Sequence, residues 1–201
     1  MRLKIWSQPQ DYRDFSQVMD DYVRCVAQGV QPEALWFLEH KPVYTLGLRT
    51  SPQDLVGKDP EVPCVPTKRG GLATYHGPGQ RVVYIIKKLE GTISQYLRCL
   101  QVWLQQSLKH WGVDSVFDDH PLGLWVPRSG QQFWKIASIG IRVHKSIAFH
   151  GFAVNIANDL RPFSTIQACG LSCRVTSLHD QGYTKYSMND FDQLLIQYCP
   201  F

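Results

Sequence analysis

The sequence of 201 residues predicts an α+β fold, a mixed β-sheet with flanking helices, in one domain that covers residues 1–201. Short runs of strand character outnumber segments of helical periodicity, and the helical segments stand apart between β-rich stretches. A doubly wound parallel fold would instead alternate strands and helices regularly. We therefore expect helices packed against a sheet.

Three segments carry apolar residues at helical spacing. The first covers residues 11–28 and is followed by Gly29, and the second covers 92–111 and is followed by Gly112. Glycine is the usual residue just beyond a helix end, so both boundaries are marked. The third helix is expected to begin near Ser187, whose side chain can cap its first turn.

Eight short runs are rich in β-branched, aromatic and aliphatic residues, and brief turns separate several of them. They cover residues 3–6, 35–39, 43–46, 72–75, 82–86, 123–126, 134–143 and 146–154. The last two predict a β-hairpin that turns near His144 and Lys145.

Composition removes several classes of function. The net charge of +4 is mild and its basic residues form no stripe, so it does not indicate nucleic-acid binding. No run of about 18 apolar residues indicates a membrane span, and the N-terminus has no apolar core of a signal peptide. Cys169 and Cys173 lack a matching second pair for a zinc site. The cysteines are expected to be thiols in a reducing cytoplasm.

The segment 68–80 concentrates four glycines, Arg69 and His76. Glycines allow a close approach of the backbone to a ligand, Arg69 can bind a carboxylate or phosphate, and His76 can bond a ligand carbonyl. The segment matches neither a P-loop nor a dinucleotide fingerprint. The structural alternative is two consecutive turns with a solvated arginine.

Lys135 stands in an apolar stretch. In a regular strand it would share a face with Ala137 and Ile139, and burial there would lower its pKa because desolvation disfavours the charged form. A lysine of this kind beside a thiol can take its proton or stabilise the thiolate. The alternative is a lysine of an edge strand that faces water.

The stretch His150-Gly-Phe-Ala-Val-Asn155 ends the predicted hairpin. Gly151 and Ala153 are small enough to leave a slot for an acyl chain, and Asn155 can bond a catalytic lysine or a substrate. A buried strand that ends in a turn explains the same residues without a site.

Cys169 lies among small and polar residues without helical or strand periodicity, which indicates an exposed turn. It is our candidate nucleophile. A cysteine hydrolase, with His150 or His76 and Asn155 completing a papain-like set, is an alternative on residue types alone.

Together these segments resemble the lipoyl(octanoyl) transferases, which are grouped with lipoate and biotin protein ligases. The resemblance runs in family order from about residue 39 to 178. It rests on Glu39-His40, Pro42-Val-Tyr-Thr-Leu-Gly47, Arg69-Gly-Gly-Leu-Ala-Thr-Tyr-His-Gly-Pro-Gly-Gln80, Gly123-Leu-Trp-Val126, Lys135-Ile-Ala-Ser-Ile-Gly140, His150-Gly-Phe-Ala-Val-Asn155, Cys169-Gly170 and Val175-Thr-Ser-Leu178.

The resemblance implies an acyltransferase that moves an octanoyl group from acyl carrier protein to a lysine of lipoyl domains, in 2-oxo-acid dehydrogenases and the glycine cleavage H protein. It implies Cys169 as the nucleophile of a thioester intermediate and Lys135 as its general acid/base. It implies no metal or other cofactor, because the incoming thioester is already activated. The implied substrate-binding residues are Arg69, Gly70, Gly71, Leu72, Ala73, Thr74, Tyr75, His76, Ser138, Ile139, Gly140, Gly151, Phe152 and Ala153.

The chain departs from the family pattern at a few positions. Ala168 stands where the family commonly has proline, Leu124 where it has valine, and Lys41 follows Glu39-His40. These positions touch turn shape and packing more than reactive groups. Two alternatives stay open: an ATP-dependent lipoate or biotin ligase, and a non-catalytic module that binds lipoyl or carrier domains.

Overall fold

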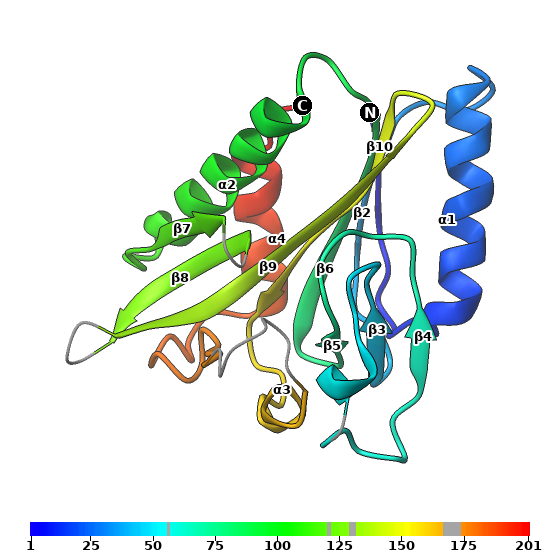
Figure 1. The fold of residues 1–201 in the computed structure, drawn as a ribbon. Coiled ribbons are helices and arrows are strands. Elements are labelled where there is room, and N and C mark those ends of the chain that lie inside the picture. Colours follow the sequence, from blue (N-terminus) through cyan, green and yellow to red (C-terminus); the bar gives the residue numbers. More distant parts are fainter. Residues whose placement is uncertain (56, 120–121, 129–131, 167–173) are drawn as a thin grey trace.

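A computed structural model describes residues 1–55, 57–119, 122–128, 132–166 and 174–201 (Figure 1). Within these residues seven strands form one sheet in the order β1-β2-β6-β10-β9-β8-β7, and three more form a small sheet in the order β4-β3-β5. In the large sheet β1 and β2 are parallel and the other neighbours are antiparallel. The strands are β1 (Arg2–Ile5), β2 (Ala34–Leu38), β3 (Val43–Leu46), β4 (Cys64–Pro66), β5 (Thr74–His76), β6 (Gln80–Lys88), β7 (Val116–Asp119), β8 (Leu122–Arg128), β9 (Gln132–His144) and β10 (Ile147–Asn155). The predicted mixed sheet is confirmed.

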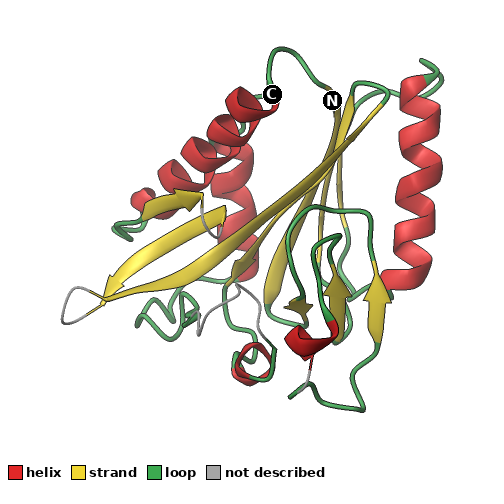
Figure 2. Cartoon of the chain, in the orientation of Figure 1, coloured by secondary structure: helices red, strands yellow, loops and turns green. Residues whose placement is uncertain are grey.

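Helices cover both faces of the large sheet (Figure 2). Helix α1 (Tyr12–Ala27) lies on one face, and α2 (Ile93–His110) and α4 (Met188–Gln197) lie together on the other. Helix α1 buries Phe15, Met19 and Val23 against β2, β6 and β10. The opposite face holds a larger apolar core between the sheet, α2 and α4. We call these the α1 face and the α2 face.

Side chains fix the start of each long helix. The Asp11 carboxylate accepts from two backbone N–H groups at the first turn of α1. Thr92 with Gln95, and Ser187 with Asp190, form capping boxes at α2 and α4. Each box satisfies helical N–H groups that would otherwise lack partners, so all three predicted helices begin where their capping residues stand.

The predicted hairpin is confirmed, and its turn is Lys145-Ser146. Both residues have positive φ angles, of 47° and 64°, as two-residue hairpin turns of the mirror-image type require. The predicted strand at 72–75 is displaced, because β5 covers Thr74–His76.

Four short elements were not predicted: β4, β7, the 3₁₀ helix η1 (Pro52–Leu55) and α3 (Arg161–Ser164). Each has three or four residues, too few to display a period of 2.0 or 3.6. Among the described residues, no helix is long and apolar enough to cross a membrane.

Candidate functional site

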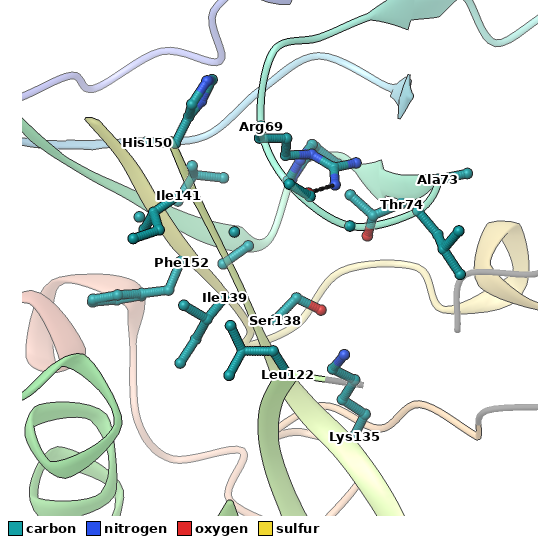
Figure 3. Close-up of a pocket in the computed structure, with 18 of the residues that line it drawn as sticks. Arg69, Ala73, Thr74, Leu122, Lys135, Ser138, Ile139, Ile141, His150 and Phe152 are labelled. Carbon is teal, nitrogen blue, oxygen red and sulfur yellow. Dashed lines mark hydrogen bonds between the residues drawn. The ribbon is translucent and has the colours of Figure 1, made fainter. Parts of the chain in front are cut away.

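A cavity of about 290 Å³ lies between the loop that precedes β5 and the strands β9, β10 and β6 (Figure 3). It unites three segments that are far apart in the sequence. The predicted residues that line it are Arg69, Gly70, Gly71, Leu72, Ala73, Thr74, His76, Lys135, Ser138, Ile139, Gly140, Gly151, Phe152 and Ala153.

Two predicted site residues are not among the described residues that line the cavity. Tyr75 is buried beside Tyr44 and Phe163 in a small separate core, and it is not part of the cavity lining. Cys169 lies outside the described residues, so its predicted role stays a prediction.

The loop at the cavity is held by its own arginine. The Arg69 guanidinium donates to the Thr45 carbonyl at 2.7 Å, to the Thr45 hydroxyl at 2.9 Å and to the Gly70 carbonyl at 3.0 Å. Gly70 N–H donates to the Ile141 carbonyl of β9 at 3.2 Å. Arg69, expected to bind an anion, thus fastens the loop to β3, while the loop backbone joins the edge of β9.

Gly47 makes this packing possible. A Cβ atom at this position would lie 2.3 Å from the Gly71 carbonyl oxygen and 2.9 Å from an Arg69 nitrogen. Leu48 and Arg49 then donate backbone N–H groups to the carbonyls of Arg69 and Gly71. Only glycine allows the two segments to approach this closely.

Small residues lie opposite one another where β9 and β10 border the cavity. Gly140 pairs with Gly151, and Ser138 pairs with Ala153. A Cβ on Gly140 would come 3.4 Å from the Arg69 Cδ, so even one methyl group would narrow the space under the loop. The strands therefore leave a slot beneath the loop, and its occupation by an acyl chain stays a prediction.

Lys135 is buried, with 6% of its surface exposed, but not on the face that was predicted. The pairing of β8 with β9 shifts after Leu124, so that Ile136 is an extra residue on β9 and forms a β-bulge. The bulge breaks the alternation of side chains. Ile136 and Ala137 both enter the core of the α2 face, and Lys135 lies with Ser138 on the cavity side (Figure 3).

The segment after residue 173 is bound alongside this lysine. Lys135 N–H donates to the Arg174 carbonyl at 2.8 Å, and Thr176 N–H donates to the Lys135 carbonyl at 2.9 Å. Val175, between them, lines the cavity. The chain that leads away from Cys169 is thus fixed beside Lys135 five residues later.

A second irregularity acts on His150, in the middle of β10. Its φ angle of 61° is rare for a residue other than glycine and breaks the alternation of the strand. Its ring stacks on the neighbouring Phe149, with centroids 5.0 Å apart, and meets Tyr84 edge-on at 5.9 Å. The left-handed residue thus turns the imidazole from the α2 face to the cavity.

Three buried histidines, His40, His76 and His150, lie around Tyr84 and Tyr12 at the cavity. Burial lowers the pKa of His40 to about 4 and those of His76 and His150 to about 3, and nearby Arg69 adds to the last two shifts. All three are therefore neutral at pH 7.

Hydrogen bonds define two of the tautomers. His40 Nδ1 faces the Gln10 carbonyl at 3.1 Å and must donate, so Nε2 accepts from the Tyr84 hydroxyl at 2.7 Å. His76 Nδ1 donates to the Gln80 side-chain oxygen at 2.6 Å, which leaves Nε2 as an acceptor.

The same network reaches the segment beside Lys135. Gln80 donates to the Asn155 side-chain oxygen at 2.9 Å, and Asn155 donates to the Thr176 carbonyl at 3.0 Å. Asn155, which we expected to bond the lysine or a substrate, instead couples β6 and β10 to Thr176. His76 is thereby linked through Gln80 and Asn155 to the segment that flanks Lys135.

Several lining residues were not found from the sequence. Tyr12 and Leu97 sit on helices, Tyr84 in a buried strand and Phe163 in α3, where each reads as an ordinary core residue. No local signal separates them from the core. Among the described residues, no group of three or more His, Cys, Asp or Glu side chains could hold a metal ion.

Solved structures with low sequence identity share the fold of this chain. The chain aligns over 98% of its length with lipoate-protein ligase A bound with ATP, with a TM-score of 0.74, 18% identity and 83% of that chain covered. An archaeal bipartite lipoate protein ligase from Thermoplasma acidophilum gives a TM-score of 0.73 at 17% identity, with 98% and 81% of the chains covered. The predicted likeness to lipoate ligase catalytic domains is confirmed.

Sequence comparison defines the family. Residues 11–199 match the model of the lipoyl protein ligase A/B catalytic domain, and the chain belongs to this family. It is 37% identical over 191 residues to an octanoyltransferase of Rickettsia rickettsii, with 92% of this chain and 90% of the relative covered. An octanoyltransferase of Rickettsia bellii is 38% identical over 193 residues, with 93% and 91% covered. The protein is an acyltransferase, as the sequence predicted.

Proposed function

We propose that the protein transfers an octanoyl group from acyl carrier protein to a specific lysine of lipoyl domains, through a thioester on Cys169. The observation that carries the proposal is the cavity. It brings the small residues of β9 and β10, the glycine loop and buried Lys135 together, at the point where the segment following Cys169 is anchored. The similarity to octanoyltransferases supports octanoyl as the transferred acyl group.

The chain length to Cys169 agrees with this role. Arg174 is the fifth residue after Cys169, and an extended chain of five steps spans at most about 18 Å between the two Cα atoms. Because the Arg174 carbonyl accepts a hydrogen bond from Lys135 N–H, the covalent chain keeps Cys169 in the neighbourhood of Lys135.

The first half-reaction would exchange one thioester for another. Lys135, as the neutral amine, takes the proton of the Cys169 thiol, and the thiolate attacks the carbonyl carbon of the octanoyl thioester. The new carbon–sulfur bond forms as the bond to the carrier's sulfur breaks. The carrier leaves as a thiol with the proton returned by Lys135.

The second half-reaction would form the amide. The amino group of a lipoyl-domain lysine attacks the Cys169 thioester, Lys135 relays its proton to the departing sulfur, and octanoyl-lysine is released. A thioester is an activated acyl group, so no nucleotide is needed in either step. The four described cysteines are free thiols, which supports our further proposal that the enzyme works in the reducing cytoplasm.

Intact-mass spectrometry after mixing the protein with octanoyl-acyl carrier protein tests the proposal. We expect an octanoyl adduct on the wild type without ATP, lost in Cys169→Ala and retained in Cys173→Ala. Adding a lipoyl domain should discharge it. An adduct that requires ATP would instead identify a ligase, and the absence of any adduct together with carrier binding would identify a binding module.

A further inference from the structure

Gly123 lies directly under the side chain of Lys135. In β8 it pairs with Ser138, so the two residues share the cavity face of the sheet. A Cβ atom on Gly123 would lie 2.4 Å from Lys135 Cε and 3.3 Å from Nζ. The lysine therefore occupies the space that any other residue at position 123 would fill.

The path of the lysine explains this contact. Lys135 pairs with Trp125, and its Nζ lies 5.4 Å from the centre of that ring. Trp125 and Gly123 are two residues apart on one face of β8, so the side chain runs along β8, past the indole and over the glycine. The bulge at Ile136 puts the lysine on this face, and Gly123 keeps its path clear.

We propose that Gly123 is a positioning residue that directs the Lys135 amine toward the reacting thioester, an inference that rests on the proposed function. A methyl group at position 123 would push Cε and Nζ off this path. A displacement of about 1 Å at a reacting group can slow a reaction about a hundredfold. Every residue type other than glycine carries a Cβ atom, so even alanine would contact the lysine and force its side chain to move.

A backbone contact must be separated from this effect. The same Cβ would lie 2.3 Å from the Ala137 carbonyl oxygen, so Gly123→Ala also strains the β8–β9 pairing. Val126→Ala is the matched control. Val126 lies in the same strand, pairs with Trp134 and is buried in the core of the α2 face, away from the lysine.

The first test measures the amine itself and needs no substrate. Competitive acetylation followed by mass spectrometry compares Lys135 with exposed Lys109 in the wild type, Gly123→Ala and Val126→Ala. We expect Gly123→Ala to change the reactivity of Lys135 and its pH dependence, and Val126→Ala to leave both unchanged. Unchanged reactivity in folded Gly123→Ala would overturn the inference.

The second test measures octanoyl-enzyme formation. We expect Gly123→Ala to lower its rate about a hundredfold and to shift its pH profile toward that of Lys135→Ala. Gly123→Ala should lower the rate much less in the Lys135→Ala background, because the displaced group is absent. An equal loss of rate in both backgrounds would reject the positioning role of Gly123. A wild type without any adduct would refute the proposed function but leave the acetylation result standing.

Failure of Gly123→Ala to fold is also informative. If the variant folds once Lys135 is replaced by alanine, the lysine side chain is the obstacle, as we propose. If it fails in both backgrounds, the Ala137 carbonyl is the obstacle, and Gly123 serves the sheet rather than the lysine. Thermal unfolding of the four proteins decides between these results.

Discussion

The two faces of the large sheet use the same strands for different purposes. The α2 face is a continuous apolar core under α2 and α4, with one buried ion pair between Arg81 and Asp192 at 2.8 Å. The α1 face is apolar only beneath the helix. Beyond it, neutral histidines and tyrosines replace the core beside the cavity, which Leu97, Ile139 and Phe152 line from the α2 face. The α2 face therefore supplies most of the apolar stabilisation, and the α1 face sacrifices some of it to hold a site.

The largest expected effect is on rate, at the cavity. Lys135→Ala should slow octanoyl-enzyme formation by about 10²- to 10⁴-fold, the usual contribution of a positioned acid or base. Its unfolding midpoint should change little by comparison. Single-turnover kinetics measure the rate, and urea unfolding measures the midpoint. Lys109→Ala, which replaces an exposed lysine, is the control. A rate within a few-fold of the wild type would remove Lys135 from the mechanism.

Phenylalanine truncation on each face sharpens the comparison. Phe191 of α4 is fully buried on the α2 face, and Phe15 of α1 packs against His40 and Tyr84. Each change to alanine should cost about 3–5 kcal/mol of unfolding free energy. Only Phe15→Ala should also slow acyl transfer per folded molecule, because only it loosens the histidine cluster. Equal effects of both variants on transfer would contradict the division between the faces.

Acid should destabilise the α1 face first. The pKa values of His40, His76 and His150 in the folded protein lie below the unfolded value of about 6.5, so the unfolded chain binds more protons between these values. The contribution of these neutral histidines to the free energy of unfolding is fully present above about pH 6.5. It is lost toward pH 4, by about 1.4 kcal/mol per pH unit for each histidine.

The ion pair on the α2 face changes the stability with pH in the opposite direction. Burial raises the pKa of Asp192 to about 6 although Arg81 opposes the shift, so the folded protein binds more protons than the unfolded chain below pH 6. Urea unfolding at pH 7.5, 6 and 5 measures the sum. Exposed His144→Gln should leave the slope unchanged. A free energy of unfolding that does not decrease as the pH is lowered would show that the buried histidines are not held neutral.

The smallest effect is expected for His150→Gly. Glycine adopts a φ angle of 61° without strain, so the variant should regain about 1–3 kcal/mol of unfolding free energy. The loss of the ring contacts of His150 offsets this gain. The free energy of unfolding should also depend less steeply on pH, because one of the three buried histidines no longer contributes. The net change in the unfolding midpoint at pH 7.5 should therefore be small, and His150→Ala, which keeps the strain, should be less stable. Equal stability of the two variants would show that the left-handed angle is not strained.

Local patterns in the sequence predicted the helices and the hairpin, whereas most of the cavity-lining residues were expected from the family resemblance. Capping residues mark α1, α2 and α4, and clustered glycines mark the loop at 69–71. Two features escaped prediction because each interrupts the alternation of a strand. Strict alternation placed Lys135 with Ala137, whereas the bulge pairs Trp125 with Lys135 and leaves Ile136 over. No local pattern revealed that β10 turns His150 toward Tyr84.

The bulge also decides which face of the sheet the residues before Ile136 occupy. The pairing on both sides of Ile136 is regular, so a chain shorter by that one residue would restore an unbroken ladder between β8 and β9. Trp125 would still lie opposite Lys135 in that ladder, so the lysine would stay on the cavity side. In a regular strand that kept Ile136, Lys135 would instead share the face of Ala137 and enter the apolar core beneath α2, so the extra residue must be accommodated as a bulge for the lysine to reach the cavity.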